Sequence, residues 1–137
     1  MEVLVVNQYF MGEPIDSFTF FRIPKVLFAD PAYKDLSTGA KLLYSLMLDR
    51  VMLSILNEWK DKRGHIFIYF TIKEIMREIE CCRQTAVNLL DELEKADLIE
   101  RKKQGMGRPN RIYVKRFESD TSRSSKIEPD KSKTQTP

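Results

Sequence analysis

Hydrophobic residues recur every three or four positions from residue 36 to about residue 59, and this spacing predicts a long α-helix. Ser37 stands just before the pattern and is a candidate N-cap. The apolar positions are Ala40, Leu43, Tyr44, Met47, Val51, Ile55 and Trp59, widened by Leu46, Leu48, Met52 and Leu53. Because the apolar stripe is this wide, we expect the helix to be central and buried on most sides.

A second helical pattern is interrupted by a tight turn. Thr71 and Glu74 have the spacing of a capping box, so a helix is expected from there to about Ile79. Residues 80–82 then turn the chain, and another helix begins near Arg83. The residues expected to face the core are Ala86, Val87, Leu90, Leu93 and Leu98. Two helices joined in this way predict a helix-turn-helix.

Segments rich in β-branched and aromatic residues predict strands at residues 65–70, 99–104 and 111–117. The last two are joined by a glycine-containing turn, which makes a hairpin directly after the helix-turn-helix. Two further β-prone segments, residues 3–6 and 17–23, precede the helices. The predicted fold class is therefore α+β, a winged helix-turn-helix with an N-terminal extended arm.

The same patterns divide the chain into three parts. Residues 1–35 are expected to form the extended arm or hairpin, and residues 36–117 the winged-helix domain. Residues 118–137 are rich in Ser, Thr, Lys, Asp and Pro and contain almost no hydrophobic residues. Such a segment buries too little surface to offset its ordering entropy, so a disordered, linker-like tail is expected there.

The distribution of charge indicates a function, because the excess positive charge lies on the predicted hairpin. Residues 101–116 contain seven basic side chains and no acidic one: Arg101, Lys102, Lys103, Arg108, Arg111, Lys115 and Arg116. Residues 1–100 carry a net charge of −4 and residues 117–137 a net charge of 0, against +3 for the whole chain. A concentrated positive patch neutralises the phosphates of duplex DNA, so residues 36–117 are predicted to bind DNA. The alternative is a solvated basic hairpin without a partner, and the preceding helix pair argues against it.

Side chains at the start of the third helix have the chemistry that reads bases, since Arg matches guanine while Asn and Gln match adenine. The predicted base-reading residues are Arg83, Gln84, Thr85 and Asn88. The hairpin would be a wing, with Arg108 near its tip able to reach a minor groove. The predicted wing and phosphate contacts are Lys73, Lys102, Lys103, Arg108, Asn110, Arg111 and Lys115.

Composition excludes several other classes of function. The two cysteines, Cys81 and Cys82, are adjacent, and with the single histidine, His65, they cannot complete a tetrahedral zinc site. The chain contains neither a GxxxxGK[ST] phosphate loop nor a recognisable nucleophile–base pairing. We therefore expect no metal, no cofactor and no enzymatic activity. Apolar runs fall far short of the ~18 residues of a membrane helix, and without a signal peptide we expect a cytoplasmic protein that contacts no membrane.

The residues also resemble those of a known family. Residues 36–49 (LSTGAKLLYSLMLD), 81–93, 98–101 and 105–114 (GMGRPNRIYV) are similar to the N-terminal domain of plasmid replication initiators, the RepA_N family. The resemblance covers roughly residues 18–117. It implies a winged-helix domain that binds repeated sites in a replication origin, usually as a homodimer. Initiators of this family also contact host replication proteins through a separate C-terminal domain, which this chain is not expected to contain.

The sequence thus predicts specific binding of double-stranded DNA at a plasmid replication origin. Two alternatives are left open. One is a transcriptional repressor with the same fold, whose sites would lie across a promoter. The other is a winged helix that serves only as a protein-interaction module, against which the basic wing argues.

Overall fold

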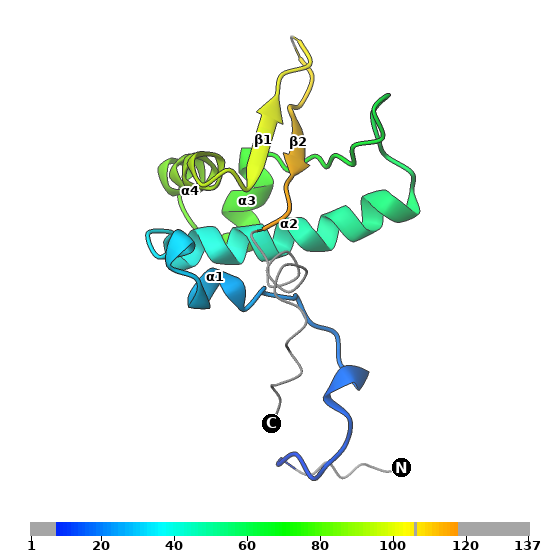
Figure 1. The fold of residues 1–137 in the computed structure, drawn as a ribbon, viewed down its shortest axis with the longest axis vertical. Coiled ribbons are helices and arrows are strands. Elements are labelled where there is room, and N and C mark those ends of the chain that lie inside the picture. Colours follow the sequence, from blue (N-terminus) through cyan, green and yellow to red (C-terminus); the bar gives the residue numbers. More distant parts are fainter. Residues whose placement is uncertain (1–7, 106, 118–137) are drawn as a thin grey trace, which may run out of the picture.

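A computed structural model describes residues 8–105 and 107–117 of the chain (Figure 1). Three short helical turns come first: η1 (Ile15–Ser17), α1 (Val26–Ala29) and η2 (Pro31–Tyr33). The helices α2 (Thr38–Leu56), α3 (Ile72–Ile79) and α4 (Arg83–Lys95) follow, and then the antiparallel strands β1 (Ile99–Lys102) and β2 (Arg111–Val114). This order of elements confirms the predicted α+β class and has the helix-turn-helix followed by a hairpin. Within the described residues, no helix is both long and apolar enough to cross a membrane.

The first half of α2 is the centre of the molecule. The Ser37 hydroxyl accepts a hydrogen bond from the Ala40 N–H at 3.2 Å, so Ser37 is the N-cap as predicted. The Glu92 carboxylate of α4 in turn accepts from the Ser37 N–H at 2.8 Å and from its hydroxyl at 2.9 Å. Leu43 and Tyr44 have no exposed surface. The start of α2 is therefore tied to α4 by polar bonds as well as by packing.

The second half of α2 differs from the prediction. The helix ends at Leu56, because Glu58 adopts a left-handed conformation with φ of 59°. Met52, Leu53 and Ile55 are each more than half exposed, so the helix is not buried on most sides here. Trp59 lies beyond the helix and is 45% exposed, stacked on the Phe67 ring rather than enclosed in the core. A wide apolar stripe predicts burial only where another element covers each side.

The predicted helix-turn-helix is formed by α3 and α4. The Thr71 hydroxyl accepts from the Glu74 N–H at 3.1 Å, and the Glu74 carboxylate accepts from the Thr71 N–H at 2.9 Å, which completes the expected capping box. The bond from the Thr71 N–H holds the pKa of Glu74 below its ordinary value. Glu80, in the left-handed region at φ of 60°, ends α3. Ile75 of α3 is completely buried against the rest of the core.

The hairpin is shorter than predicted and has an incomplete third strand. In the antiparallel pair of β1 and β2, Lys102 lies opposite Arg111. The strand predicted at residues 65–70 is wrong in extent: Ile68 makes an isolated bridge to Ile112, with reciprocal backbone hydrogen bonds of 2.9 Å. The segment lies outside the named strands because Ile66 bridges back to Lys60 instead of joining the sheet.

The N-terminal arm does not form the strand expected at residues 17–23. Of the arm predicted at residues 1–35, residues 8–24 contain only the single turn η1 and extend away from the helices (Figure 1), whereas Val26, Leu27 and Tyr33 are buried in the core. The Phe18 ring meets Phe10 and Phe20 edge-to-face, with centroid distances of 5.9 and 6.4 Å. No strand lies beside the described arm to pair with it, and an unpaired strand is marginal in water. The strand expected at residues 3–6 and the tail expected at 118–137 lie outside the described residues.

Candidate nucleic-acid interface

The four predicted base readers lie together on the first turns of α4, and all four side chains are exposed. Gln84 and Asn88 are one helical turn apart and share a face, and the Gln84 side-chain amide donates to Asn88 Oδ1 at 2.9 Å. Arg83 makes no ion pair with any described residue. The buried face of α4 consists of Ala86, Leu89, Leu90 and Leu93. The packing of that face therefore presents the predicted readers outward.

The two cysteines lie directly before this helix. Cys82 is the N-cap of α4, but its side chain makes no capping hydrogen bond. Its sulfur lies 3.4 Å from the Thr85 hydroxyl, and this contact lowers the pKa of the Cys82 thiol. Burial raises the pKa of the half-buried Cys81 thiol. Both are free cysteines, and no group of three or more His, Cys, Asp or Glu in the described residues could hold a metal.

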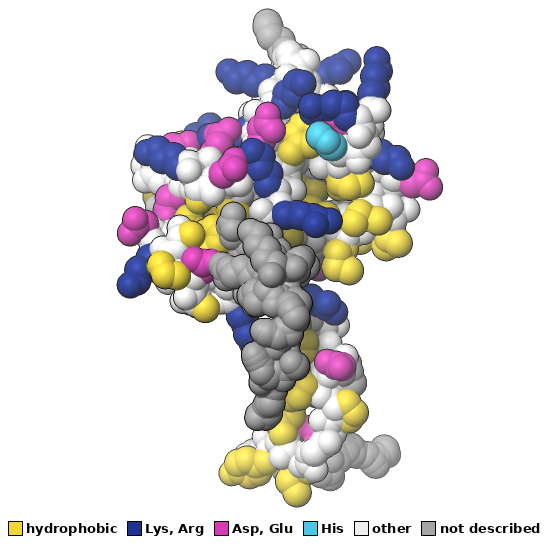
Figure 2. Space-filling view, in the orientation of Figure 1, with side chains coloured by type: hydrophobic (Ala, Val, Ile, Leu, Met, Phe, Trp, Pro, Cys, Tyr) yellow, Lys and Arg dark blue, Asp and Glu magenta, His cyan; other side chains and the backbone are white. Residues whose placement is uncertain are grey.

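The cations of the hairpin gather toward its tip. Lys102, Lys103, Arg108 and Asn110 are exposed there, and Figure 2 shows Lys and Arg side chains crowded over this end of the molecule. Arg111 is held more firmly than the others. Its guanidinium lies 4.3 Å from the centroid of the Phe67 ring, and its Nε donates to Gln104 Oε1 at 3.0 Å. The wing thus combines flexible lysines with one pre-positioned guanidinium.

Two hairpin cations are already paired with acids of the same domain. The Arg101 guanidinium donates to Glu94 at 2.6 and 2.9 Å and to Asp91 at 2.9 Å. Lys115 Nζ lies 2.6 Å from Asp97 Oδ1, and this bond raises the pKa of Lys115. The net charge of residues 101–116 therefore overstates the number of cations that are free to bind phosphates. Lys115 remains a predicted phosphate contact, but it would first have to leave Asp97.

A hollow of about 370 Å³ separates the helix-turn-helix from the wing. Its lining includes Thr71 at the start of α3, Leu90 of α4, and Arg108 and Asn110 of the wing. Lys73, the remaining predicted phosphate contact, is exposed on the first turn of α3. Of the predicted contacts, Arg108 and Asn110 of the wing line this hollow, while Lys73 and the four predicted readers on α4 lie outside its lining.

Sequence reasoning missed a second group of cations. Lys60, Lys62 and Arg63 lie in the turn before the Ile68 segment, and with Lys102 and Arg111 they line a hollow of about 380 Å³. The signal in the sequence is the run KDKRG, residues 60–64, directly before the strand predicted at residues 65–70. The position of this run beside the wing depends on a long-range contact, the bridge between Ile68 and Ile112.

Comparison with known proteins gives one family and several relatives. The family model described as "Replication initiator protein A (RepA) N-terminus" matches residues 19–127. A curated relative, the "41 kDa protein" of Lactobacillus helveticus, is 29% identical over 126 residues, which are 88% of this chain and 35% of that protein. The chain thus spans about a third of the length of this relative.

Three solved structures share the fold and a substantial part of the sequence. One is described as "N-Terminal domain of DNA binding protein", with 31% identity, a TM-score of 0.67, and coverage of 91% of this chain and 98% of that one. "Structure of Rep-DNA complex" has 31% identity, a TM-score of 0.67, and coverage of 90% and 97%. "Structure of MDR initiator" has 33% identity, a TM-score of 0.63, and coverage of 87% and 97%.

Proposed function

Because this chain belongs to the family of replication initiator protein A (RepA) N-terminal domains, we propose that it binds double-stranded DNA at repeated sites in a plasmid replication origin. The observation that carries the proposal is the shared surface of α4 and the wing. Exposed side chains of the predicted readers lie on the first turns of α4, exposed cations lie on the hairpin, and a hollow lined by Leu90 of α4 and Arg108 of the hairpin lies between the two elements. A relative of the same fold is described as a complex with DNA.

In this proposal α4 enters the major groove with its first turns leading. Arg83 pairs with a guanine, and Gln84 and Asn88, which already bond to each other, exchange that bond for one with an adenine edge. Asp91, further along the helix, is neutralised by Arg101 and so repels the phosphates less. In this arrangement α4 supplies the sequence specificity, and the wing supplies most of the electrostatic attraction to the DNA phosphates.

The wing supplies that attraction. Arg108 reaches the adjacent minor groove, and Lys102, Lys103 and Arg111 meet phosphates on either side of it. Lys73 and Asn110 face the strand that crosses the hollow between α3 and the hairpin. We assign no catalytic step and no cofactor to the domain, and we place its activity in the cytoplasm, where a plasmid replicates.

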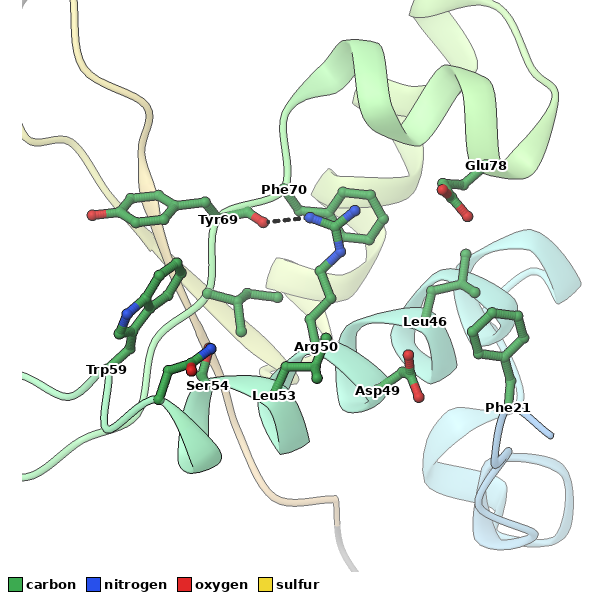
Figure 3. Close-up of a pocket in the computed structure, with 12 residues that line it drawn as sticks. Phe21, Leu46, Asp49, Arg50, Leu53, Ser54, Trp59, Tyr69, Phe70 and Glu78 are labelled. Carbon is green, nitrogen blue, oxygen red and sulfur yellow. Dashed lines mark hydrogen bonds between the residues drawn. The ribbon is translucent and has the colours of Figure 1, made fainter. Parts of the chain in front are cut away.

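We further propose that the domain acts as a homodimer joined through its arm. Tyr9 and Phe10 are 74% and 67% exposed, and the rings nearer the helices are about half exposed. A groove of about 500 Å³ runs along α2, and of the described arm residues only Phe21 lines it (Figure 3). The arm therefore covers little of its own domain. Exposed apolar patches of this kind mark interfaces, and a two-fold dimer matches paired half-sites on DNA.

Selection of bound duplexes from a random pool tests the function and separates it from both alternatives. For an initiator, the recovered motif should recur in tandem within the origin of the replicon that encodes the chain. A motif found only across promoters would indicate a transcriptional repressor. A pool that is not enriched at all would indicate a protein-interaction module and would overturn the proposal.

Host replication proteins are a further proposed partner. The resemblance assigns their binding to a separate C-terminal domain of the initiators, and the curated relative extends well beyond the matched region. The part of the chain that the structure describes is thus proposed to position the initiator on DNA, while the contact with the host machinery is made elsewhere.

A further inference from the structure

The turn formed by residues 60–65 is a small hairpin of its own. Lys60 and Ile66 form an antiparallel bridge, and the Asp61 N–H donates to the His65 carbonyl at 3.0 Å. The Gly64 N–H closes the turn on the Asp61 carbonyl at 2.9 Å, and Gly64 takes a positive φ of 84°. Such a conformation is open to glycine without strain. The turn therefore has a defined shape, which a solvated run of charges does not require.

One carboxylate fastens this turn to the wing. Asp61 Oδ1 accepts from the backbone N–H groups of Arg63 and His65 at 2.8 and 3.0 Å. Asp61 Oδ2 accepts from the Tyr113 hydroxyl of β2 at 3.0 Å. These bonds, with that to His65 foremost, lower the pKa of Asp61 to about 2, so the carboxylate stays ionised. The turn is thus joined to the wing by a direct hydrogen bond, although their residues are far apart along the chain.

Positive charge from both segments converges where they meet. The hollow of about 380 Å³ is lined by five cations, one acid and a tyrosine: Lys60, Lys62, Arg63, Lys102, Arg111, Asp61 and Tyr113. Neither Lys60 nor Lys62 nor Lys102 forms an ion pair within the described residues, and Arg63 pairs only with Asp61, at 3.5 Å. Unpaired cations held close together repel one another, and a polyanion relieves that repulsion.

We propose that the turn at residues 60–65 is a second DNA-backbone contact, which binds phosphates of the duplex flanking the groove that the wing occupies. This inference rests on the proposed function and extends its footprint. Lys102 and Arg111 belong to both the wing and the hollow, so a duplex held by the wing is brought to the turn. Base contacts are not required, and the turn adds affinity without adding sequence preference.

The ligand is a duplex backbone rather than a single strand with stacked bases. Binding of single strands relies on exposed aromatic faces. Tyr113, the aromatic residue in the lining of the hollow, is 7% exposed, and Phe67 beneath Arg111 is 8% exposed. Arg111 already covers Phe67, with the guanidinium carbon 4.3 Å from the ring centroid. What the surface offers is charge, and charge fits phosphates of either strand of a duplex.

The test compares two triple variants of the full chain on the same duplexes. Lys60→Gln, Lys62→Gln and Arg63→Gln together remove the cations of the turn. Lys25→Gln, Lys34→Gln and Lys95→Gln form the matched control, since these exposed cations lie outside the wing, the turn, the arm at residues 8–24 and the first turns of α4. All six side chains are exposed, so the fold is retained, which circular dichroism and thermal melting verify. Titrations use duplexes that carry the selected site. In one duplex the DNA on the first side of the site is extended by about one helical turn, and in the other duplex the DNA on the second side is extended by the same length.

The turn variant should bind several-fold more weakly at low salt, and its slope of log K against log[salt] should be shallower by roughly 2 to 3. The unmodified chain should gain affinity when one flank of the duplex is extended, and the turn variant should lose this gain. The control variant should keep both the steeper salt slope and the gain in affinity. The inference is overturned if the turn variant matches the control in slope and in flank gain. It is equally overturned if only single-strand binding is lost. Failure of the unmodified chain to bind any duplex would instead refute the proposed function.

Discussion

At the scale of single residues, side chains with similar chemistry separate according to their partners. Arg83 is exposed and makes no ion pair with a described residue, whereas Arg101 forms ion pairs with Glu94 and Asp91. The sequence predicts which residue types suit DNA, but their availability depends on acids brought close by folding. Asp91 and Glu94 lie on the helix before the hairpin, so their pairing with Arg101 was not visible in the charge count. The exposure of the four predicted readers on α4 was predictable because helical spacing alone fixes their face.

Replacement of Arg83 by alanine should cost about 1–3 kcal/mol on the preferred duplex and relax the preference at one base pair. Lys103→Ala, which removes an exposed cation near the wing tip, should weaken all duplexes about equally. Competition binding with a set of single-base-pair variants of the site measures both effects. Unchanged discrimination in Arg83→Ala would remove this residue from the set of base readers.

Asp61 should make the stability of the domain depend on acid. Its folded pKa, lowered to about 2, lies below the ordinary value of 3.8, so the ionised form stabilises the fold at neutral pH. That contribution is complete above the unfolded pKa and is lost as the pH falls from about 4 toward 2. Urea midpoints of the unmodified chain and Asp61→Asn should therefore converge over this range. Parallel midpoints from pH 7 to pH 2 would show that the carboxylate charge does not hold the turn.

At the scale of elements, features set by neighbouring residues were predictable and features set by distant contacts were not. The capping box of Thr71 and Glu74 is a four-residue signal, and it is present. The extended segment around Ile68 has the composition of a strand, but its pairing is decided by Ile112, far along the chain. The end of α2 was placed too late, because apolar residues beyond Leu56 are used for packing rings outside the helix.

The start of α4 offers a simple gain in stability. Cys82 has the extended backbone of an N-cap, with φ of −80° and ψ of 170°, but its side chain makes no cap hydrogen bond. A serine hydroxyl accepts such a bond well, so Cys82→Ser should raise the free energy of unfolding by about 0.5–1 kcal/mol. Chemical denaturation monitors the change, with Cys81→Ser, in the preceding turn, as the matched control. A less stable Cys82→Ser protein would show that the contact between the thiol and Thr85 matters more than the cap.

At the scale of the whole molecule, the domain has a basic end and an apolar end. Cations gather over the wing, while hydrophobic side chains lie along the arm at the opposite end (Figure 2). The basic run and the aromatic residues of the arm are far apart along the chain, and the fold places them at opposite ends of the molecule. The sequence does not place residues 60–65 beside the wing, because that proximity results from two long-range contacts with β2, the bridge of Ile68 to Ile112 and the hydrogen bond from Tyr113 to Asp61.

The apolar end makes a prediction about assembly. Phe10→Ser, Phe18→Ser and Phe20→Ser together should shift the protein toward monomer in sedimentation and weaken binding to a two-site duplex more than to a single half-site. The cause is loss of the exposed ring cluster that we assign to the partner. Leu56→Ser, at the exposed end of α2, is the control for a different apolar surface. A triple variant that stays dimeric, beside a Leu56→Ser protein that does not, would move the interface to α2.

The most direct test of DNA recognition by α4 and the wing is a titration of one selected duplex and one shuffled duplex of equal length across a range of salt. Four wing cations free of acids, Lys102, Lys103, Arg108 and Arg111, give an expected slope of log K against log[salt] of roughly −3 to −4 per protomer, steeper if the turn at residues 60–65 also binds. The selected duplex should remain the tighter ligand at every salt concentration, because α4 reads its bases. A slope near zero, or equal affinity for the two duplexes, would contradict recognition by this surface.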